Sequence, residues 1–461
     1  MFFVIKRIAA MVVAVALIGC APISADTEVS PSVIAAFGAP PDVPSGPLPP
    51  DLEKAVTKAF KGSVADVTSL PRSSWGPESS AALEQIVAAG DPRVVWLITD
   101  LMRFTFRQAQ FKELSDAAGA ILGKSWDQQN DWNDIIDHMI AWDVPAFPGY
   151  LTYKRDIFTN ALPGWEGIFV PGEIDWRLVS WGGVPIDARG FDETDIPCNC
   201  IPAADNPPTQ GADAATWLDD DDVIFGIVIN GEARAYPRRI MEVREMVNDT
   251  LGGRDLAIPY CTLCGAAQAY FTDAVPAGVK RPVMRTSGLL IRSNKVMYDI
   301  TSGSVFDTFL GKAVTGALLE QGVTLPQATV VTSDWGTWKE TYPETTVLLE
   351  RLALGRDFDF RSGRDAQGPI FPVGDVDPRL PVQADVVGVI ASDGAPVAFD
   401  RGSALLALRA GEDVATGGVR LELAAGGLSA AAADGTALSS HEAFWFAWSQ
   451  FHPETALWAG N

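Results

Sequence analysis

The sequence predicts an α+β protein, in which an N-terminal helical (HEAT-like) region precedes a mainly β domain made of two related lobes. Three observations support this prediction. Apolar residues recur at helical spacing between residues 51 and 145. From residue 219 onward, short apolar runs alternate with Asn-Gly, Gly-Gly and Asp-Gly turns, which is typical of antiparallel strands. The pattern of residues 219–350 then returns in reduced form within residues 351–461.

Length and composition are those of a folded, acidic protein with more than one domain. The chain of 461 residues is long enough for two or three domains, and it is 47% hydrophobic and 20% charged. The formal net charge of -23 argues against nucleic acid as a partner, because phosphate binding needs a basic surface.

The N-terminal segment has the pattern of an export signal. Lys6 and Arg7 precede an apolar run that is too short to span a bilayer. The run ends in Leu17-Ile18-Gly19-Cys20, which resembles the bacterial lipobox. We therefore expect residues 1–19 to be a signal peptide and Cys20 to carry a lipid. The mature protein would then be anchored to a membrane and face the periplasm or the cell surface. A plain secretory signal is the alternative.

The next segments are a tether and a helical region. Residues 20–50 have the composition of a semi-stiff tether, because prolines recur among small residues. In the helical region of residues 51–145, Gly90-Asp91-Pro92 has the pattern of one helix end followed by the cap and first residue of the next helix. This pattern resembles HEAT repeats, and we expect it to offer a docking surface to an envelope protein. The expected helices begin near Ala81 and cover Val94–Phe106, Phe111–Leu122 and Trp132–Trp142.

A connector and the first β-rich lobe follow. Residues 146–218 are rich in Gly, Pro and Trp, have little periodicity, and carry Cys198 and Cys200, so we expect an irregular connector. The first lobe, residues 219–350, begins with a hairpin whose strands are joined by Asn230-Gly231. It contains Cys261-x-x-Cys264 between two apolar runs.

The second lobe, residues 351–461, repeats this plan without cysteines. Val386–Phe399 echoes the first hairpin, with Asp393-Gly394 at the turn. Trp338–Thr345 is echoed by Trp448–Thr455, so that His452 corresponds to Tyr342 and is expected to pack rather than to catalyse. Duplicated lobes of this kind commonly place a site near their interface.

The four cysteines after Cys20 are the candidates for chemistry. Cys261-x-x-Cys264-Gly265 has the shape of a zinc-ribbon knuckle, in which the glycine lets backbone N–H groups approach the sulfurs. One knuckle supplies two ligands, and Cys198 and Cys200 could complete a tetrahedral site. In an extended chain Cys198 and Cys200 are not expected to bridge each other. The alternative is two crosslinks that join them to Cys261 and Cys264.

The residue pattern leaves three roles for these cysteines open. Structural disulfides would close a loop of about sixty residues and contribute about 4 kcal/mol. A metal site would bind zinc, or a cuprous ion with Met297 or Met284 as a thioether ligand. A reversible dithiol is the third role, although β patterns on both sides of the motif argue against a thioredoxin-like enzyme.

Several short motifs occur together in the C-terminal half of the chain. They are Asn230–Pro237, Val247-Asn248-Asp249, Gly252-Gly253, Tyr260-Cys261-x-x-Cys264-Gly265, Ser287-Gly288-x-Leu290, Met297-Tyr298-Asp299 and Trp448–Thr455. Through these motifs, the chain from about residue 195 to its end resembles an uncharacterised bacterial and archaeal family, a domain of unknown function with a Tyr-Cys-x-x-Cys-Gly signature. The resemblance implies no established activity.

The chain departs from the pattern of that family at three places. Thr262 stands where relatives usually carry Pro, and Arg244 stands where they often carry His. If that His is a metal ligand in relatives, this chain lacks it. The motif Cys198-x-Cys200 is also not a feature of the family pattern.

The sequence therefore predicts a cell-envelope lipoprotein with a site for metal binding or thiol redox chemistry at Cys261 and Cys264, together with Cys198 and Cys200. The expected metal is zinc or copper. The alternative is a non-catalytic envelope scaffold or binding protein in which the cysteines form structural disulfides. The expected supporting residues are Tyr260, Gly265, Met297, Asp299 and Arg244.

Overall fold

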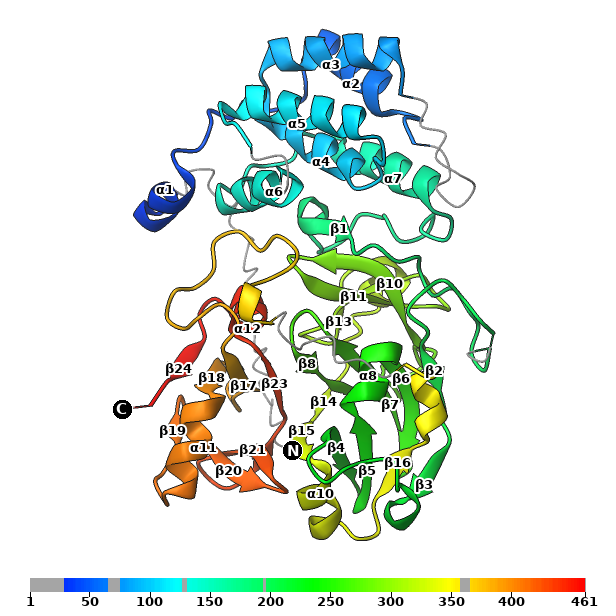
Figure 1. Cartoon of the computed structure of the whole chain (residues 1–461), viewed down its shortest axis with the longest axis vertical. Coiled ribbons are helices and arrows are strands. Elements are labelled where there is room, and N and C mark those ends of the chain that lie inside the picture. The colour runs from blue at the N-terminus through cyan, green and yellow to red at the C-terminus, as the bar shows by residue number, and fades with distance from the viewer. Residues whose placement is uncertain (1–28, 65–74, 127–130, 194–195, 357–364, 461) are drawn as a thin grey trace, which may run out of the picture. The chain divides into compact units, whose positions relative to one another are not determined.

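The computed structural model describes residues 29–64, 75–126, 131–193, 196–356 and 365–460 (Figure 1). The chain divides into two units, Met1–Pro40 and Pro41–Asn461. The first unit contains α1 (Pro31–Phe37), which begins where the Ser30 side chain accepts a hydrogen bond from the Val33 N–H. The expected signal peptide and Cys20 lie outside the described residues. None of the helices in the described ranges is long and apolar enough to cross a membrane.

The second unit begins with a helical region, as the sequence predicts. Gly90 ends α3 in the left-handed conformation at φ 64°, and the Asp91 carboxylate accepts a hydrogen bond from the Arg93 N–H as the next turn begins. The expected Gly-Asp-Pro helix boundary is therefore confirmed. The helices are α2 (Pro50–Phe60), α3 (Pro77–Ala89), α4 (Val95–Met102), α5 (Gln108–Leu122), α6 (Asp131–Ala141) and α7 (Tyr150–Ala161).

The helix α7 lies in the segment that the sequence pattern assigned to an irregular connector, and on this point the prediction is wrong. Its buried side chains include Ile157 and Phe158, but the rest of its sequence is largely polar. A buried ion pair fixes it, since the Lys154 ammonium donates to the Asp100 carboxylate at 2.6 Å. A contact between two helices so far apart in the sequence leaves no periodic signal.

Three sheets form the first β-rich lobe, and each takes one edge strand from residues 146–218, the segment that the sequence pattern assigned to an irregular connector (Figure 1). One has the order β1 (Val179–Trp181), β10 (Met284–Ile291), β11 (Asn294–Asp299), β12 (Val305–Asp307) and β13 (Lys312–Ala313). Another has the order β14 (Gln327–Ala328), β9 (Ala269–Phe271), β7 (Arg254–Cys261), β6 (Met246–Leu251) and β2 (Ala204–Asp205), with β8 (Ala266–Ala267) paired to β7. The third has the order β15 (Val331–Asp334), β4 (Val223–Ile229), β5 (Glu232–Pro237), β16 (Thr346–Leu348) and β3 (Thr209–Gly211).

Two further sheets form the second lobe. One has the order β23 (Ser440–Phe444), β17 (Asp385–Ile390), β18 (Pro396–Asp400) and β24 (Ala456–Trp458). The other has the order β19 (Ala415–Thr416), β20 (Val419–Ala424), β21 (Gly427–Ala432) and β22 (Ala437–Leu438). The helices of the two lobes are α8 (Arg238–Arg244), α9 (Gly316–Glu320), α10 (Trp335–Thr341), α11 (Arg401–Arg409) and α12 (Trp445–Phe451).

The β15-β4-β5-β16 sheet and the β23-β17-β18-β24 sheet follow one plan. In each, an antiparallel hairpin forms the centre, and the last strand pairs parallel to the second hairpin strand. The indole of Trp338 donates to the Thr345 hydroxyl, and the indole of Trp448 donates to that of Thr455. The α+β class with two related β-rich lobes, which the sequence repeat predicts, is thus confirmed.

A glycine in each hairpin makes room for the tryptophan of the following helix. A Cβ atom at Gly226 would lie 2.2 Å from the Trp338 ring, and one at Gly388 would lie 2.1 Å from the Trp448 ring. These distances are far shorter than a van der Waals contact. The equivalent packing in both lobes explains why the pattern Gly…Trp…Thr recurs.

Candidate functional site

The Cys261-x-x-Cys264 motif forms a tight turn between two strands. Cys261 ends β7, Ala266 begins β8, and a disulfide joins Cys261 to Cys264. Gly265 has a φ of +61°, a conformation that favours glycine, and a Cβ there would lie 3.2 Å from the Phe444 ring. Gly265 is therefore required by the turn and by its close packing.

The second lobe covers one side of this turn. The carbonyl oxygen of Cys264 accepts a hydrogen bond of 2.8 Å from the Phe444 N–H. Both cysteines belong to a buried cluster that also contains Phe309 of the first lobe and Trp448 of the second. The motif lies between the two lobes, in the region where the duplicated plan predicts a site.

Cys198 and Cys200 form a disulfide with each other, so the predicted crosslinks to Cys261 and Cys264 are wrong. The prediction assumed an extended chain. The segment between Pro197 and Pro202 instead bends, which brings the two Cα atoms to 5.2 Å, within the range that a disulfide spans. With each pair closed on itself, the four sulfurs do not form the tetrahedral set that the sequence suggested.

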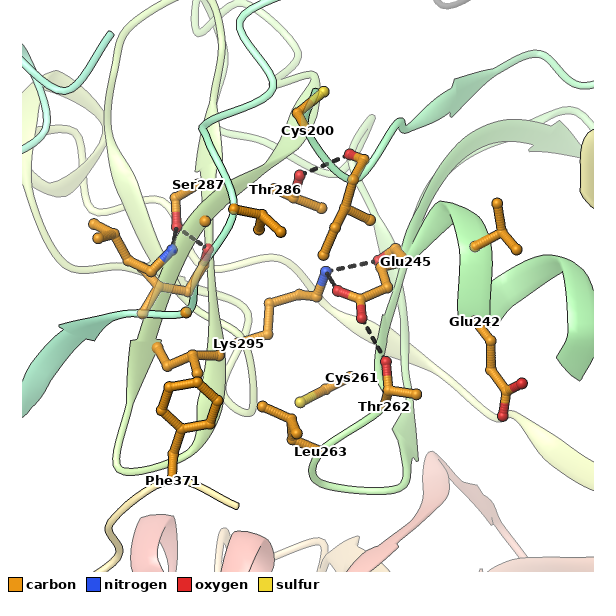
Figure 2. Close-up of a pocket in the computed structure, with 18 of the residues that line it drawn as sticks. Cys200, Glu242, Glu245, Cys261, Thr262, Leu263, Thr286, Ser287, Lys295 and Phe371 are labelled. Atoms are coloured by element: carbon orange, nitrogen blue, oxygen red, sulfur yellow. Dashed lines mark hydrogen bonds and ion pairs between the residues drawn. The ribbon is translucent and has the colours of Figure 1, made fainter. Parts of the chain in front are cut away.

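Both disulfides line one pocket of 470 Å³ (Figure 2). Cys200 enters it from the loop that precedes β2, and Cys261 enters it from the end of β7. Much of the wall is apolar, and this part consists of Val184, Ile201, Val243, Leu263, Leu289, Leu290, Val296, Ile370 and Phe371. A cavity of this volume suits a small molecule or a side chain of a bound peptide.

A bulge in β10 shapes another wall of the pocket. The register between β10 and β11 shifts between Thr286 and Leu290. Gly288, within the bulge, has a φ of +73°, and a Cβ there would lie 2.2 Å from the Val184 carbonyl oxygen. Only glycine therefore allows this close backbone approach.

A buried ion pair lies in the pocket wall beside the Cys261 turn. The Lys295 ammonium lies 2.6 Å from a carboxylate oxygen of Glu245 and also donates to the Glu245 carbonyl oxygen at 3.1 Å. The other carboxylate oxygen accepts a hydrogen bond from the hydroxyl of Thr262, the residue after Cys261. Figure 2 shows the three side chains converging. The pair thus connects β11 directly to the cysteine turn.

The backbone and the charges of this pair are both unusual. Glu245 follows α8 with a φ of 50°, a left-handed conformation that a non-glycine residue seldom adopts and that occurs at functional sites. Burial lowers the pKa of the Lys295 ammonium, and the Glu245 carboxylate opposes that shift. Only 5% of the Lys295 side chain is exposed.

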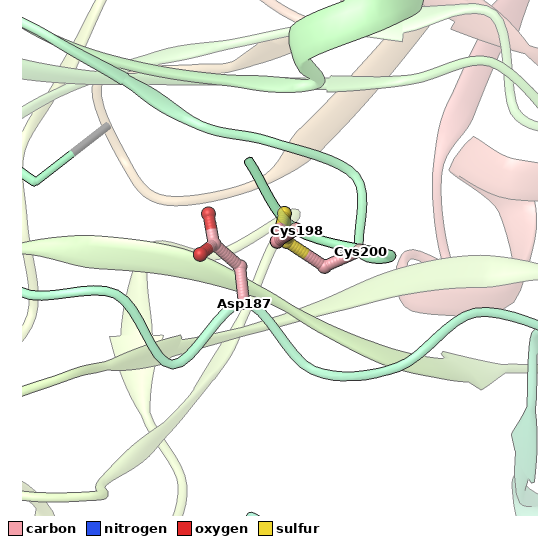
Figure 3. A group of neighbouring side chains, drawn as sticks. All are labelled: Asp187, Cys198 and Cys200. Carbon is pink, nitrogen blue, oxygen red and sulfur yellow. A yellow bond between two sulfur atoms is a disulfide. The ribbon is translucent and has the colours of Figure 1, made fainter. Parts of the chain in front are cut away.

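The Cys198–Cys200 disulfide and the neighbouring Asp187 carboxylate form a group of candidate metal ligands (Figure 3). The group offers one ligand atom from each residue, and these three atoms lie within 4.8 Å of one another, so it could hold a metal ion. The Asp187 carboxylate, however, already accepts two hydrogen bonds of 2.7 Å from the Arg189 guanidinium and one of 3.0 Å from the Ala203 N–H. Arg285 lies 3.9 Å away. Two nearby guanidinium groups favour an anionic or neutral neighbour over a metal cation.

The structure places three of the expected supporting residues away from the pocket. The Tyr260 ring packs 5.1 Å from the Phe225 ring in the core of the first lobe, because successive strand residues point to opposite faces. Met297 and Met284 share a core cluster with Phe306 and do not line the pocket. Asp299 accepts hydrogen bonds from the Val283 and Ser302 N–H groups and so has a structural role.

Arg244 contributes to the site indirectly. Its guanidinium donates to the Leu352 carbonyl oxygen at 2.8 Å and to that of Pro202 at 3.4 Å, so it helps to hold the end of the Cys198–Cys200 loop. Glu245, Lys295 and Asp187 are the residues that the sequence pattern missed. No motif marks them, because Glu245 and Lys295 are fifty positions apart and meet only through tertiary pairing.

One comparison with known proteins found a match. A family described as "Protein of unknown function (DUF3179)" matches residues 198–434. No curated protein and no solved structure matches the chain. The match begins at Cys198, contains the Cys261–Cys264 turn and the Lys295–Glu245 pair, and covers slightly more than half of the 461 residues. The chain therefore belongs to the DUF3179 family of proteins of unknown function.

Proposed function

We propose that this protein carries out thiol–disulfide exchange at Cys261 and Cys264, on a small substrate that enters the pocket. The observation that supports this proposal is the position of the Cys261–Cys264 disulfide in the wall of a 470 Å³ pocket beside the Lys295–Glu245 pair. A purely structural disulfide would need neither a pocket nor a buried cation.

The two sulfurs have different environments, which assigns them different steps. Cys261 lines the pocket, whereas Cys264 is 0% exposed and does not. In the reduced protein, the Cys261 thiolate would attack one sulfur of a substrate disulfide and release the other as a thiolate. The Cys264 thiolate would then attack Cys261 Sγ, release the second substrate thiolate and re-form the Cys261–Cys264 bond. Two electrons pass to the substrate, whose thiolates take protons from water.

The cation in the wall supports the reactive form of the cysteine. A nearby ammonium stabilises a thiolate and lowers the pKa of the thiol, and Lys295 is the ammonium that shares the pocket with Cys261. Thr262 connects the cysteine turn to Glu245, so it holds the pair in place as the sulfur changes charge. Lys295 is therefore proposed as a positioning residue for Cys261.

The proposed setting is the cell envelope. The lipobox-like Leu17-Ile18-Gly19-Cys20 supports export and a lipid anchor at Cys20, and the closed cysteine pairs suit an oxidising compartment. The helices α2 to α7, which include the helical region expected at residues 51–145, are the proposed docking surface for an envelope protein. Binding of a metal by the reduced cysteines with Asp187 is the second candidate function, supported by the proximity of their ligand atoms.

The test is the reactivity of each cysteine toward an aromatic disulfide that releases a coloured thiolate. In reduced Cys198→Ser/Cys200→Ser/Cys264→Ser protein, we expect rapid release of one thiolate from Cys261 and a stable adduct on the tryptic peptide of residues 255–280, which contains Cys261. The matched control is Cys198→Ser/Cys200→Ser/Cys261→Ser, in which the buried Cys264 should react at least about tenfold more slowly, because access controls thiol exchange.

Three outcomes would contradict the proposal. Equal reactivity of the two variants would show that the pocket does not select Cys261. No reaction of Cys261 in folded protein would support a scaffold with structural disulfides. Stoichiometric metal in the reduced protein, lost in Cys198→Ser, would favour the metal site instead.

A further inference from the structure

The Cys198–Cys200 disulfide reaches the same pocket as the Cys261–Cys264 disulfide. Cys200 and Cys261 both line it, and in the view of Figure 2 the Lys295–Glu245 pair lies between them. Cys198 and Cys200 are half-buried and Asn199 between them is exposed, whereas Cys261 is 3% exposed. One disulfide is thus open to the surface and the other is accessible only through the pocket.

The loop that carries the outer disulfide is held at its two ends. The carbonyl oxygen of Ile196 accepts from Arg189 at 3.1 Å, and that of Ile201 accepts from Thr286 at 3.0 Å. Among the hydrogen bonds of the described ranges, none involves Pro197, Cys198, Asn199 or Cys200. The loop tip is therefore tied down by none of the hydrogen bonds of the described residues, while its two ends hold it beside the pocket.

We propose that these two cysteine pairs form an internal relay, in which Cys198 and Cys200 pass two electrons to Cys261 and Cys264. The relay rests on the proposed exchange function and extends it by naming the entry point for an external dithiol. Such a dithiol first reduces the half-buried Cys198–Cys200 disulfide and leaves as a disulfide itself. The inner pair is then reduced without direct contact with the external dithiol.

The chemistry of the transfer balances within the chain. The Cys200 thiolate attacks Cys261 Sγ, the Cys261–Cys264 bond breaks, and Cys264 leaves as a thiolate. The Cys198 thiolate then attacks Cys200 Sγ, and Cys261 leaves as a thiolate from the Cys200–Cys261 bond. The outer pair is oxidised, the inner pair is reduced, and the two released thiolates take protons from water.

Trapping the mixed disulfide tests this relay. The full chain with Cys198→Ser and Cys264→Ser retains Cys200 and Cys261, and mild oxidation should join them. Digestion with trypsin would then give residues 190–234 linked to residues 255–280, which mass spectrometry identifies. Because the reaction is intramolecular, its yield should not change on roughly tenfold dilution. The matched control carries Cys200→Ser and Cys264→Ser, and it should crosslink much less because Cys198 does not line the pocket.

A kinetic measurement uses a variant that keeps the inner pair intact. In the unmodified chain dithiothreitol reduces the outer disulfide first, and that disulfide is more exposed than Cys261. In Cys198→Ser/Cys200→Ser protein dithiothreitol must instead enter the pocket, so at equal dithiothreitol the reduction of Cys261–Cys264 should be roughly tenfold slower, because access controls the rate of thiol exchange. Equal rates in this variant and the unmodified chain, or equal crosslinking in the two trapping variants, would overturn the relay. The reactivity of Cys261 in Cys198→Ser/Cys200→Ser/Cys264→Ser protein does not depend on the outer pair, so the failure of the relay is distinguishable from the failure of the exchange function.

Discussion

The protein should lose stability in mild acid through two buried histidines of the second lobe. His441 and His452 are 2% and 7% exposed, and both Nε2 atoms lack a hydrogen-bond partner among the described residues. Burial lowers the pKa of His441 to about 3, with a smaller contribution from His452, and it lowers the pKa of His452 to about 4. Both rings therefore stay neutral in the folded state at pH 5.

The size of the effect follows from the difference between the folded and unfolded states. A histidine in the unfolded chain has a pKa near 6.5, so the unfolded state binds more protons below that pH, and stability falls as the pH falls through 6.5 toward 4. At pH 5, about 1.5 units below 6.5, the loss is about 2 kcal/mol for each histidine. Above pH 7 the contribution of both histidines is fully present.

The informative variant is His452→Tyr, which places in the second lobe the residue that the first lobe has. The Tyr342 ring packs 4.6 Å from Trp338, and the His452 ring packs 4.1 Å from Trp448, so a tyrosine has a precedent at this position. Urea unfolding followed by tryptophan fluorescence at pH 7.5 and pH 5.0 would measure the loss. We expect it to be about 2 kcal/mol smaller in His452→Tyr than in the unmodified chain.

The control and the refuting result are both specific. His138→Gln should reduce the loss by less, because the His138 ring is only partly buried. Carboxyl groups such as Asp307, whose pKa burial raises to about 6, affect stability with the opposite sign but equally in all variants. If His452→Tyr loses as much stability between the two pH values as the unmodified chain, the buried neutral histidine is not the cause.

Two further predictions concern the ion pair and the repeated Gly–Trp packing. Lys295→Met should lower the unfolding free energy by about 3 kcal/mol, because it leaves the Glu245 carboxylate without its ammonium partner. It should also move the pH profile of Cys261 alkylation in Cys264→Ser protein to higher pH, because the ammonium that stabilises the thiolate is lost. Lys295→Arg should keep most of both properties, and an unchanged alkylation profile in Lys295→Met would exclude the positioning role. Gly388→Ala should cost about 3 kcal/mol in urea unfolding, since the new Cβ would overlap the Trp448 ring. Gly211→Ala, which meets open space, is the control, and equal effects of the two would show that the packing is not tight.

The sequence predicts those parts of the fold that depend on local chemistry. The Asn230-Gly231 turn has both residues at positive φ, as its hairpin requires, and the Gly90-Asp91-Pro92 boundary has the expected cap. The Cys261–Cys264 motif could be located from its spacing alone. The pairing of Cys198 with Cys200 could not be predicted, because it depends on a bend between two prolines rather than on an extended chain. Lys295 and Glu245 could not be paired either, since a β-hairpin and a helix end bring them together.

The Phe444 N–H donates a hydrogen bond to the Cys264 carbonyl oxygen, and the Phe444 ring packs against Gly265. Through these contacts the cysteine-free lobe shields Cys264 from solvent. In the proposed exchange function, one copy of the duplicated plan carries the reactive sulfurs, and the other covers Cys264. Separating the two lobes would expose Cys264 to solvent and allow disulfides to form between molecules. The copy without cysteines would then be needed for the proposed chemistry of the copy that has them.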